Sequence, residues 1–180
     1  MFLPPLLQNQ VREGQGKENV KVNVPLISFF AKIVKEPNNL NMNKIEHIGI
    51  AVKNLTESNE LFRKLLGKTH YKIEEVATEG VNTSFFKVGK NKVELLEATR
   101  EDSAIAKFID KRGEGIHHIA FAVEDIEAEM KRLSGEGFRL LNDTPKRGAD
   151  NKLVCFIHPK TANGVLVELC QEIRTVDGGR

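Results

Sequence analysis

Two stretches of the sequence share one pattern around a histidine. His47 lies in the stretch 45–52 and His118 in the stretch 115–123, and in both the second and fourth residues after the histidine are Gly or Ala. If both stretches are β-strands, alternate side chains face opposite sides. Each imidazole then shares its side with small residues, while large apolar residues occupy the other side. A histidine on such an open face indicates a cleft.

Two glutamates occupy matching places later in each half of the chain. Glu94 follows His47 by 47 residues and Glu168 follows His118 by 50, and each glutamate lies within an apolar run. A carboxylate in such a run is costly to bury unless it is paired or bound to a metal ion. Two imidazoles and two carboxylates leave room for two more oxygen ligands, which suits octahedral Co²⁺, Ni²⁺, Mn²⁺, Mg²⁺ or Fe²⁺, or Zn²⁺ with expanded coordination. The pattern therefore predicts a shared metal site.

The remaining histidines and the two cysteines fit structural roles. His117 is expected to face away from the predicted site, and His70 and His158 lie near expected strand ends, where turn or surface positions are common. Cys155 and Cys170 lie inside apolar strand patterns, which is typical of reduced thiols in a core. None of these five residues is assigned to the site.

The segments that carry the site repeat the order strand, helix, three strands. Asn54 and Asp125 are expected helix caps, and the helices are expected to end at Gly67 and at Gly135 and Gly137. Strands are expected at 44–52, 71–76, 83–88 and 92–97 in the first copy, at 115–123, 138–141, 153–157 and 164–170 in the second, with a linker helix at 103–111. This order predicts an α+β fold of two fused βαβββ modules, forming a curved, cup-shaped mixed sheet with helices outside.

The expected domain boundaries follow from this repeat. The domain spans 43–172, with the first module at about 43–99, the linker helix at about 103–111 and the second module at about 115–172, followed by a tail over 173–180. Residues 1–42 show no sustained periodicity and are expected to be a disordered extension, or sequence upstream of a natural start at Met42. A transit peptide is less expected, because several glutamates break the acid-poor pattern of such peptides.

Composition excludes several classes of partner. The chain has 180 residues, with 27 basic and 25 acidic side chains and a formal charge of +2, and no basic cluster is interleaved with aromatic residues as in nucleic-acid binders. No apolar run approaches the roughly 20 residues of a membrane-spanning helix, and the first residues lack the basic start of a secretory signal. The expected location is the cytoplasm.

Several motifs together resemble one family. The doubled stretches around His47 and His118 resemble the vicinal-oxygen-chelate superfamily, whose paired βαβββ modules hold a metal ion in a cup-shaped sheet. Within it, the chain resembles the methylmalonyl-CoA epimerase family over about residues 43–172. The motifs that carry this closer resemblance lie at 93–99, 102–108, 113–121, 158–160 and 164–169.

The resemblance implies an isomerase that inverts C2 of methylmalonyl-CoA through an enolate. By position, the family's metal ligands fall on His47, Glu94, His118 and Glu168, and some members have Gln in place of Glu94. Glu168 is implied as one catalytic base. The cofactor implied is a divalent ion, with Co²⁺ expected first and Ni²⁺, Mn²⁺, Zn²⁺ or Mg²⁺ as the alternatives, and the family also implies a homodimer.

One position departs from the family pattern. Thr83 stands where some members carry a glutamate, and a threonine hydroxyl cannot act as a base at neutral pH. The second base is then Glu94, which we favour, or a water molecule held near Thr83.

A CoA substrate also needs cations for its phosphates. The candidates are Lys146, Arg147, Lys152 and Lys160.

Two other classes of function stay open from the residues. The first class is another enzyme of the superfamily. A glyoxalase I-like isomerase would share all four ligands, whereas an Fe²⁺ extradiol dioxygenase needs two histidines and only one carboxylate. The other class is a metal-free module that binds a small molecule between the two repeats. Such relatives tend to lack the ligands, which this chain keeps.

Overall fold

The computed structural model describes Met42 and residues 44–174. The extension expected over 1–42 and the tail expected over 173–180 lie almost entirely outside the described residues. Within them, no helix is long and apolar enough to cross a membrane. The elements are β1 (Ile45–Val52), α2 (Leu55–Leu66), β2 (Lys72–Val76), β3 (Val81–Val88), β4 (Asn91–Ala98), α3 (Ala104–Arg112), β5 (Gly115–Ala122), α4 (Ile126–Gly135), β6 (Lys146–Arg147), β7 (Lys152–Ile157), the 3₁₀ helix η1 (Pro159–Thr161) and β8 (Val167–Glu172).

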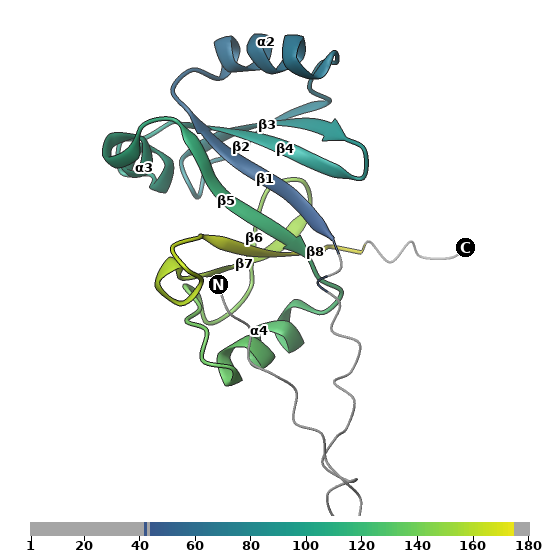
Figure 1. The fold of residues 1–180 in the computed structure, drawn as a ribbon, viewed down its shortest axis with the longest axis vertical. Helices are drawn as coiled ribbons and strands as arrows, with labels where there is room; N and C mark the ends of the chain where they lie inside the picture. Colours follow the sequence, from purple (N-terminus) through teal and green to yellow (C-terminus); the bar gives the residue numbers. More distant parts are fainter. Residues whose placement is uncertain (1–41, 43, 175–180) are drawn as a thin grey trace, which may run out of the picture. The chain divides into compact units, whose positions relative to one another are not determined.

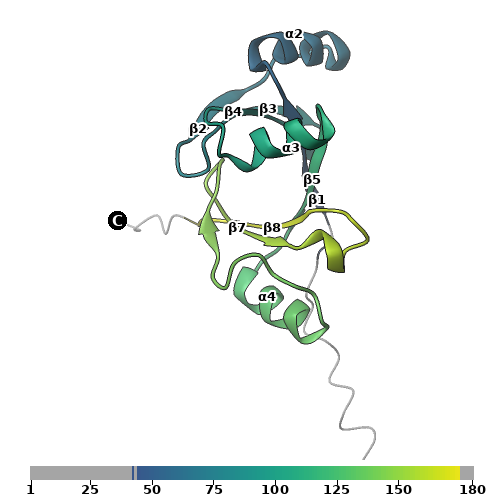
Figure 2. The ribbon, with the colours of Figure 1, turned by 90° about the vertical axis from the view of Figure 1, so that its left-hand side faces the viewer.

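The strands of the described part form one mixed sheet in which the two modules meet at the centre. The strand order is β2-β3-β4-β1-β5-β8-β7-β6. β1 and β5 pair antiparallel, and each pairs on its other side with a parallel strand, β4 or β8. The sheet curves strongly, with α2 and α4 on its outer side (Figures 1 and 2). The predicted α+β fold of two modules around a cup-shaped sheet is confirmed.

The helices begin and end where their capping residues require. The Asn54 side chain accepts a hydrogen bond from the backbone N–H of Glu57 at 3.0 Å, and Gly67 ends α2 with a φ of 67°. The left-handed conformation at that position favours glycine. Asp125 caps α4 through the N–H of Ala128 in the same way. These caps confirm the helices expected between them.

The linker helix α3 packs on a different side of the sheet from α2 and α4. Ile105 of α3 is buried in a cluster with Ala51 and Leu96, whose positions alternate in phase with His47 and Glu94. Helix α3 therefore covers one end of the inner face, which is the face that carries His47 and Glu94. By contrast, α2 covers the outer face, where its residues pack on Phe86 and Leu95.

The strand expected at 138–141 is wrong. Only one isolated bridge, between Leu140 and Ile157, occurs there. The pairing along β7 is taken instead by β6, where no strand was expected. The Asn142 side chain accepts the N–H of Phe156 at 3.3 Å, which a paired strand would otherwise bind with a backbone carbonyl. The chain therefore leaves β7 after a single bridge and pairs with it again only at Lys146, directly after Pro145.

Candidate metal centre and active site

Each half of the site is a row of residues that runs across the central strands. In the first row, Glu94 on β4, Gly49 on β1 and His118 on β5 lie directly opposite one another. A Cβ at residue 49 would lie 2.2 Å from Cε1 of His118. The imidazole therefore lies over the glycine, in space that only glycine leaves free.

The second row repeats the first across the pseudo-two-fold axis between the modules. Glu168 on β8, Ala120 on β5 and His47 on β1 lie directly opposite one another. Each row thus combines the glutamate of one module with the histidine of the other. The register explains why a small residue follows each histidine by two positions: it lies beneath the imidazole of the neighbouring strand.

The structure brings the four predicted residues together in the interior. Nε2 of His47 lies 2.9 Å from Nε2 of His118, 3.0 Å from Oε2 of Glu94 and 3.2 Å from Oε2 of Glu168. Nε2 of His118 lies 2.9 Å from Oε2 of Glu168 and 3.8 Å from Oε2 of Glu94. All four residues are at most 6% exposed.

This donor set fits a divalent metal ion. Donor atoms of His47, His118 and Glu168 all lie within 4.8 Å of one another. Adjacent ligands of an octahedral ion with bonds of about 2.1 Å are about 3 Å apart, and opposite ligands about 4.2 Å. Four of the five distances between donor atoms match the adjacent value, and the Glu94–His118 distance lies between the two. Two buried carboxylates also require a compensating cation or proton.

A β-bulge places a third carboxylate, that of Glu46, behind His47. Ile45 and His47 face consecutive residues of β5, so Glu46 is an extra residue in β1. Its Oε2 lies 2.6 Å from Nδ1 of His47. The Nδ1 proton of a neutral imidazole donated to this carboxylate leaves Nε2 as a free lone pair, as a metal ligand requires. Alternation alone would have turned Glu46 away from the site.

An equivalent bulge occurs in β5 before the other histidine. Gly49 and Ile50 face residues two apart in β5, so His117 is the extra residue there. Its Nδ1 lies 2.9 Å from Nδ1 of His118, while its ring packs against Phe108 of α3 with 5.0 Å between ring centroids. Burial, with His118 nearby, lowers the pKa of His117 to about 4. His117 was expected to face away from the site, and this orientation is wrong, because the bulge turns its ring onto His118.

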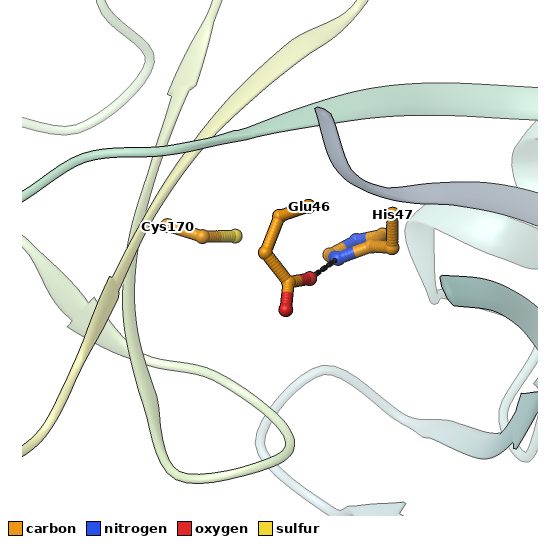
Figure 3. Close-up of side chains that lie close together, drawn as sticks. All are labelled: Glu46, His47 and Cys170. Carbon is orange, nitrogen blue, oxygen red and sulfur yellow. Dashed lines mark hydrogen bonds and ion pairs between the residues drawn. The ribbon is translucent and has the colours of Figure 1, made fainter. Parts of the chain in front are cut away.

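A network of charges surrounds Glu46. Lys92 places Nζ 2.5 Å from Oε1 of Glu46, and Nζ of Lys152 lies 3.5 Å from the same oxygen. Burial raises the pKa of the Glu46 carboxyl, but hydrogen bonds from His47 and Lys92 outweigh burial and lower the pKa to about 2. Glu46 is therefore a fixed anion. Figure 3 shows Glu46 between His47 and Cys170. These three residues form a second group whose donor atoms lie within 4.8 Å of one another.

The carboxylates also set the protonation of the site without metal. Burial lowers the pKa of His47, but hydrogen bonds with Glu168, Glu46 and Glu94 raise it well above the usual value. Burial raises the pKa of Glu168, yet hydrogen bonds from His118 and His47 hold it well below its usual range. Metal-free His47 therefore carries a proton at neutral pH, which a metal ion must displace.

The four residues expected to contact CoA differ in exposure. Lys152 is buried, and its Nζ is paired with Glu172 at 2.7 Å as well as with Glu46. Lys146, Arg147 and Lys160 are exposed, the first two on β6 and the third in η1.

Thr83 is committed to a structural contact. Its hydroxyl donates to the backbone carbonyl of Glu74 at 3.0 Å, and the residue is 2% exposed. Both cysteines are buried free thiols, as expected.

A family model for the Glyoxalase/Bleomycin resistance protein/Dioxygenase superfamily matches residues 46–156, and the chain belongs to this superfamily. Two relatives of known name are similar to most of the domain. The mitochondrial methylmalonyl-CoA epimerase of Dictyostelium discoideum is 40% identical over 131 residues, which cover 72% of this chain and 79% of that protein. The ethylmalonyl-CoA/methylmalonyl-CoA epimerase of Cereibacter sphaeroides is 41% identical over 130 residues, covering 71% of this chain and 97% of that protein.

A solved structure agrees with these relatives. A variant of Streptomyces coelicolor methylmalonyl-CoA epimerase in complex with 2-nitronate-propionyl-CoA is 38% identical with a TM-score of 0.71, covering 73% of this chain and 98% of that one. The family resemblance predicted from the sequence motifs is confirmed.

Proposed function

We propose that the chain is a methylmalonyl-CoA epimerase, an isomerase that interconverts (R)- and (S)-methylmalonyl-CoA by removing and returning the proton at C2. Relatives and a solved structure with this name support the assignment. The observation that carries it is the position of the two carboxylates: Glu94 on β4 and Glu168 on β8 flank the two histidine strands. The names of these relatives favour this reaction over the glyoxalase I-like and metal-free alternatives.

Inversion at C2 requires a proton acceptor on one face of the carbon and a donor on the other. C2 lies between a thioester and a carboxylate, so loss of its proton gives an enolate. Glu168, which is ionised at neutral pH, takes the proton on one face, and Glu94 serves the other. Because the hydroxyl of Thr83 is held by the carbonyl of Glu74, Glu94 is a better second base than a water molecule near Thr83.

A divalent cofactor completes the proposal, with Co²⁺ expected first. His47, Glu94, His118 and Glu168 would hold it, and the ion would supply Lewis-acid stabilisation of negative charge on the substrate oxygens. Glu46 and His117 orient the two imidazoles. The His118→Ala variant is expected to lose bound metal, so an unchanged metal stoichiometry would count against this ligand set.

The remaining parts of the proposal concern the surroundings of the site. Lys146, Arg147 and Lys160 are exposed and available to CoA phosphates, whereas Lys152 is available only if it exchanges its carboxylate partners. A homodimer and a cytoplasmic location are also part of the proposal, the first by family resemblance and the second from the sequence.

Deuterium exchange tests the proposed function. The protein is incubated with methylmalonyl-CoA in deuterated water, once loaded with cobalt and once stripped by a chelator, and the product is followed by mass and by stereoisomer. Uptake of deuterium at C2 together with racemisation, both dependent on metal, is expected. Folded, cobalt-loaded protein that exchanges no deuterium would refute the epimerase assignment, and hemithioacetals would then be the next substrates to test.

A further inference from the structure

The side chain of Asp150 connects the second module to strands of the first. Asp150 lies at the tip of the hairpin between β6 and β7 in the second module. Its Oδ2 lies 2.7 Å from Nζ of Lys92 on β4 and 3.2 Å from the hydroxyl of Tyr71, which donates to it. Its backbone N–H donates to Oε2 of Glu74 on β2 at 2.9 Å. Lys72 adds a longer contact, 3.4 Å from its Nζ to Oδ1 of Asp150.

The hairpin tip is built to present this side chain. Asp150 and Asn151 both have positive φ, 52° and 56°, and the N–H of Lys152 returns to the carbonyl of Ala149 at 3.3 Å. This is the conformation of a two-residue hairpin turn, in which Asp and Asn are favoured. Asn151 is bonded to the backbone of Ile173 at the end of its own module. Asp150 instead reaches across to the other module.

Asp150 lies beside the place where the proposed substrate would bind. A small cavity beside the candidate metal centre is lined by Asp150 together with Lys92, His47, Glu94 and Glu168. An acyl group held between the two glutamates would enter this cavity, and methylmalonyl-CoA carries a carboxylate on that group and phosphates on its CoA. Two anions that share a poorly hydrated cavity repel each other strongly. Asp150 and the substrate's anion therefore compete for the same cations.

The partners of Asp150 are suited to bind another anion. Lys92 is 14% exposed in its side chain and has one carboxylate partner fixed on a strand, Glu46, and one carried on the hairpin tip, Asp150. Removal of Asp150 would leave Lys92 with one anion where it now has two. Tyr71 would lose the acceptor of its hydroxyl. A carboxylate or phosphate oxygen can take both contacts.

We propose that Lys92 and Tyr71 form an anion subsite for the substrate, which Asp150 fills in the substrate-free protein and vacates when the substrate's own anion binds. The inference rests on the proposed function, because it names part of the substrate site of that enzyme. The hairpin tip thus acts as a latch whose anion is exchanged for the anion of the ligand. The ligand group is either the carboxylate of the malonyl unit or a phosphate of CoA, which share this chemistry.

Binding measurements on a pair of variants test the exchange. Asp150→Asn keeps the shape of the side chain and removes its charge, and Asp143→Asn makes the same change at an exposed position in the same module. Calorimetry with metal-loaded protein gives Kd for coenzyme A, for methylmalonate and for methylmalonyl-CoA. If the latch is closed in about nine of ten molecules, Asp150→Asn should bind methylmalonyl-CoA about tenfold more tightly, with Asp143→Asn unchanged.

The two partial ligands identify the group that fills the subsite. Tighter binding of coenzyme A by Asp150→Asn assigns the subsite to a phosphate, and tighter binding of methylmalonate assigns it to the malonyl carboxylate. Unchanged affinity for all three ligands, or an equal gain in the Asp143→Asn control, would overturn the proposal.

The wild-type protein offers an independent measurement. Tyr71 is the sole tyrosine of the chain, so tyrosine labelled with ¹³C gives one set of ring signals in an NMR spectrum. Binding of methylmalonyl-CoA and the Asp150→Asn substitution should move these signals in the same direction. Ring signals that stay unmoved on saturation with ligand would contradict the exchange, even if the variant failed to fold. Wild-type epimerase activity is assayed in parallel: an active enzyme with an unmoved Tyr71 refutes only the latch, whereas an inactive protein that shows the exchange refutes only the epimerase.

Discussion

The two modules supply the same pair of donors to the site but support them differently. In each, a bulge places the residue before the histidine against its Nδ1, but that residue is Glu46 in the first module and His117 in the second. Glu46 is an anion held by Lys92, whereas His117 is a neutral imidazole packed against a helix. The two modules are thus alike in the histidines and glutamates of the site, and they differ in the residue that contacts Nδ1 of each histidine.

The neighbouring strands show why the supports differ. Lys92 stands two residues before Glu94, and the corresponding residue before Glu168 is Leu166. The second module therefore has no cation at the place where Lys92 stabilises an anion in the first. A neutral partner suits His118 in these surroundings, while a carboxylate makes His47 the more basic ligand. The difference predicts unequal responses to matched substitutions in the two modules.

The largest expected effect tests whether the two halves act on opposite faces of C2. Glu168→Gln and Glu94→Gln each remove one acid–base group and should slow epimerisation by about 10² to 10⁴-fold. Each variant should still exchange deuterium into one epimer, and the two variants should differ in which epimer that is. Metal content serves as the control, since glutamine keeps an oxygen donor. A variant that retains most of its activity would remove that residue from the mechanism.

The second comparison concerns the residues behind the histidines. Glu46→Gln should weaken metal binding by about 10- to 100-fold, because an amide is a poorer acceptor for Nδ1–H of His47 than a carboxylate. His117→Gln replaces one neutral partner by another and should cost less than about tenfold. Metal titration of both variants gives the two values. Equal losses would show that the two supports are equivalent after all.

Proton release should sharpen the same contrast. In the metal-free protein the pKa of His47 is raised well above its usual value, so the ring is protonated at neutral pH and must lose its proton on binding metal. Metal affinity should therefore rise about tenfold per pH unit below this pKa and level off above it. Calorimetry in buffers of different ionisation enthalpy counts the protons released. Binding without proton release would contradict the raised pKa.

The smallest effect concerns the residues beneath the imidazoles. Gly49→Ala would place a methyl group 2.2 Å from the His118 ring, which should cost about 1–3 kcal/mol of unfolding free energy. The matched change Ala120→Gly removes a methyl group from beneath His47 and should cost about 0.5–1 kcal/mol. Urea unfolding of the metal-free proteins measures both values. A Gly49→Ala variant as stable as the wild type would show that His118 moves freely.

The sequence predicted the inner part of this arrangement well because it follows from periodicity. Strand alternation and the repeat place two histidines and two glutamates in register, and the caps at Asn54 and Asp125 define the module helices. A bulge adds one residue without changing the apolar–polar alternation of the strand, so alternation directs Glu46 and His117 away from the site. In hindsight, a glutamate directly before a ligand histidine was the one available sign.

Contacts between distant parts of the chain also escaped prediction. Lys92 and Asp150 are 58 residues apart and belong to different modules, and neither position is marked by a motif. Lys152 was expected to contact a CoA phosphate but is buried, because Glu46 and Glu172 provide carboxylates for its ammonium group. Such pairings depend on how the sheet curves, which local sequence does not specify.

The position of a bound metal ion tests the central claim most directly. His47 belongs to two groups of donors, one with His118 and Glu168 and one with Glu46 and Cys170. Crystals of the cobalt-loaded protein, measured at the cobalt absorption edge, locate the ion without assumptions about its ligands. One anomalous peak within bonding distance of Nε2 of both His47 and His118 and of the Glu94 and Glu168 carboxylates is expected. A peak between Glu46 and Cys170, or none in the interior, would contradict a site shared by the two modules.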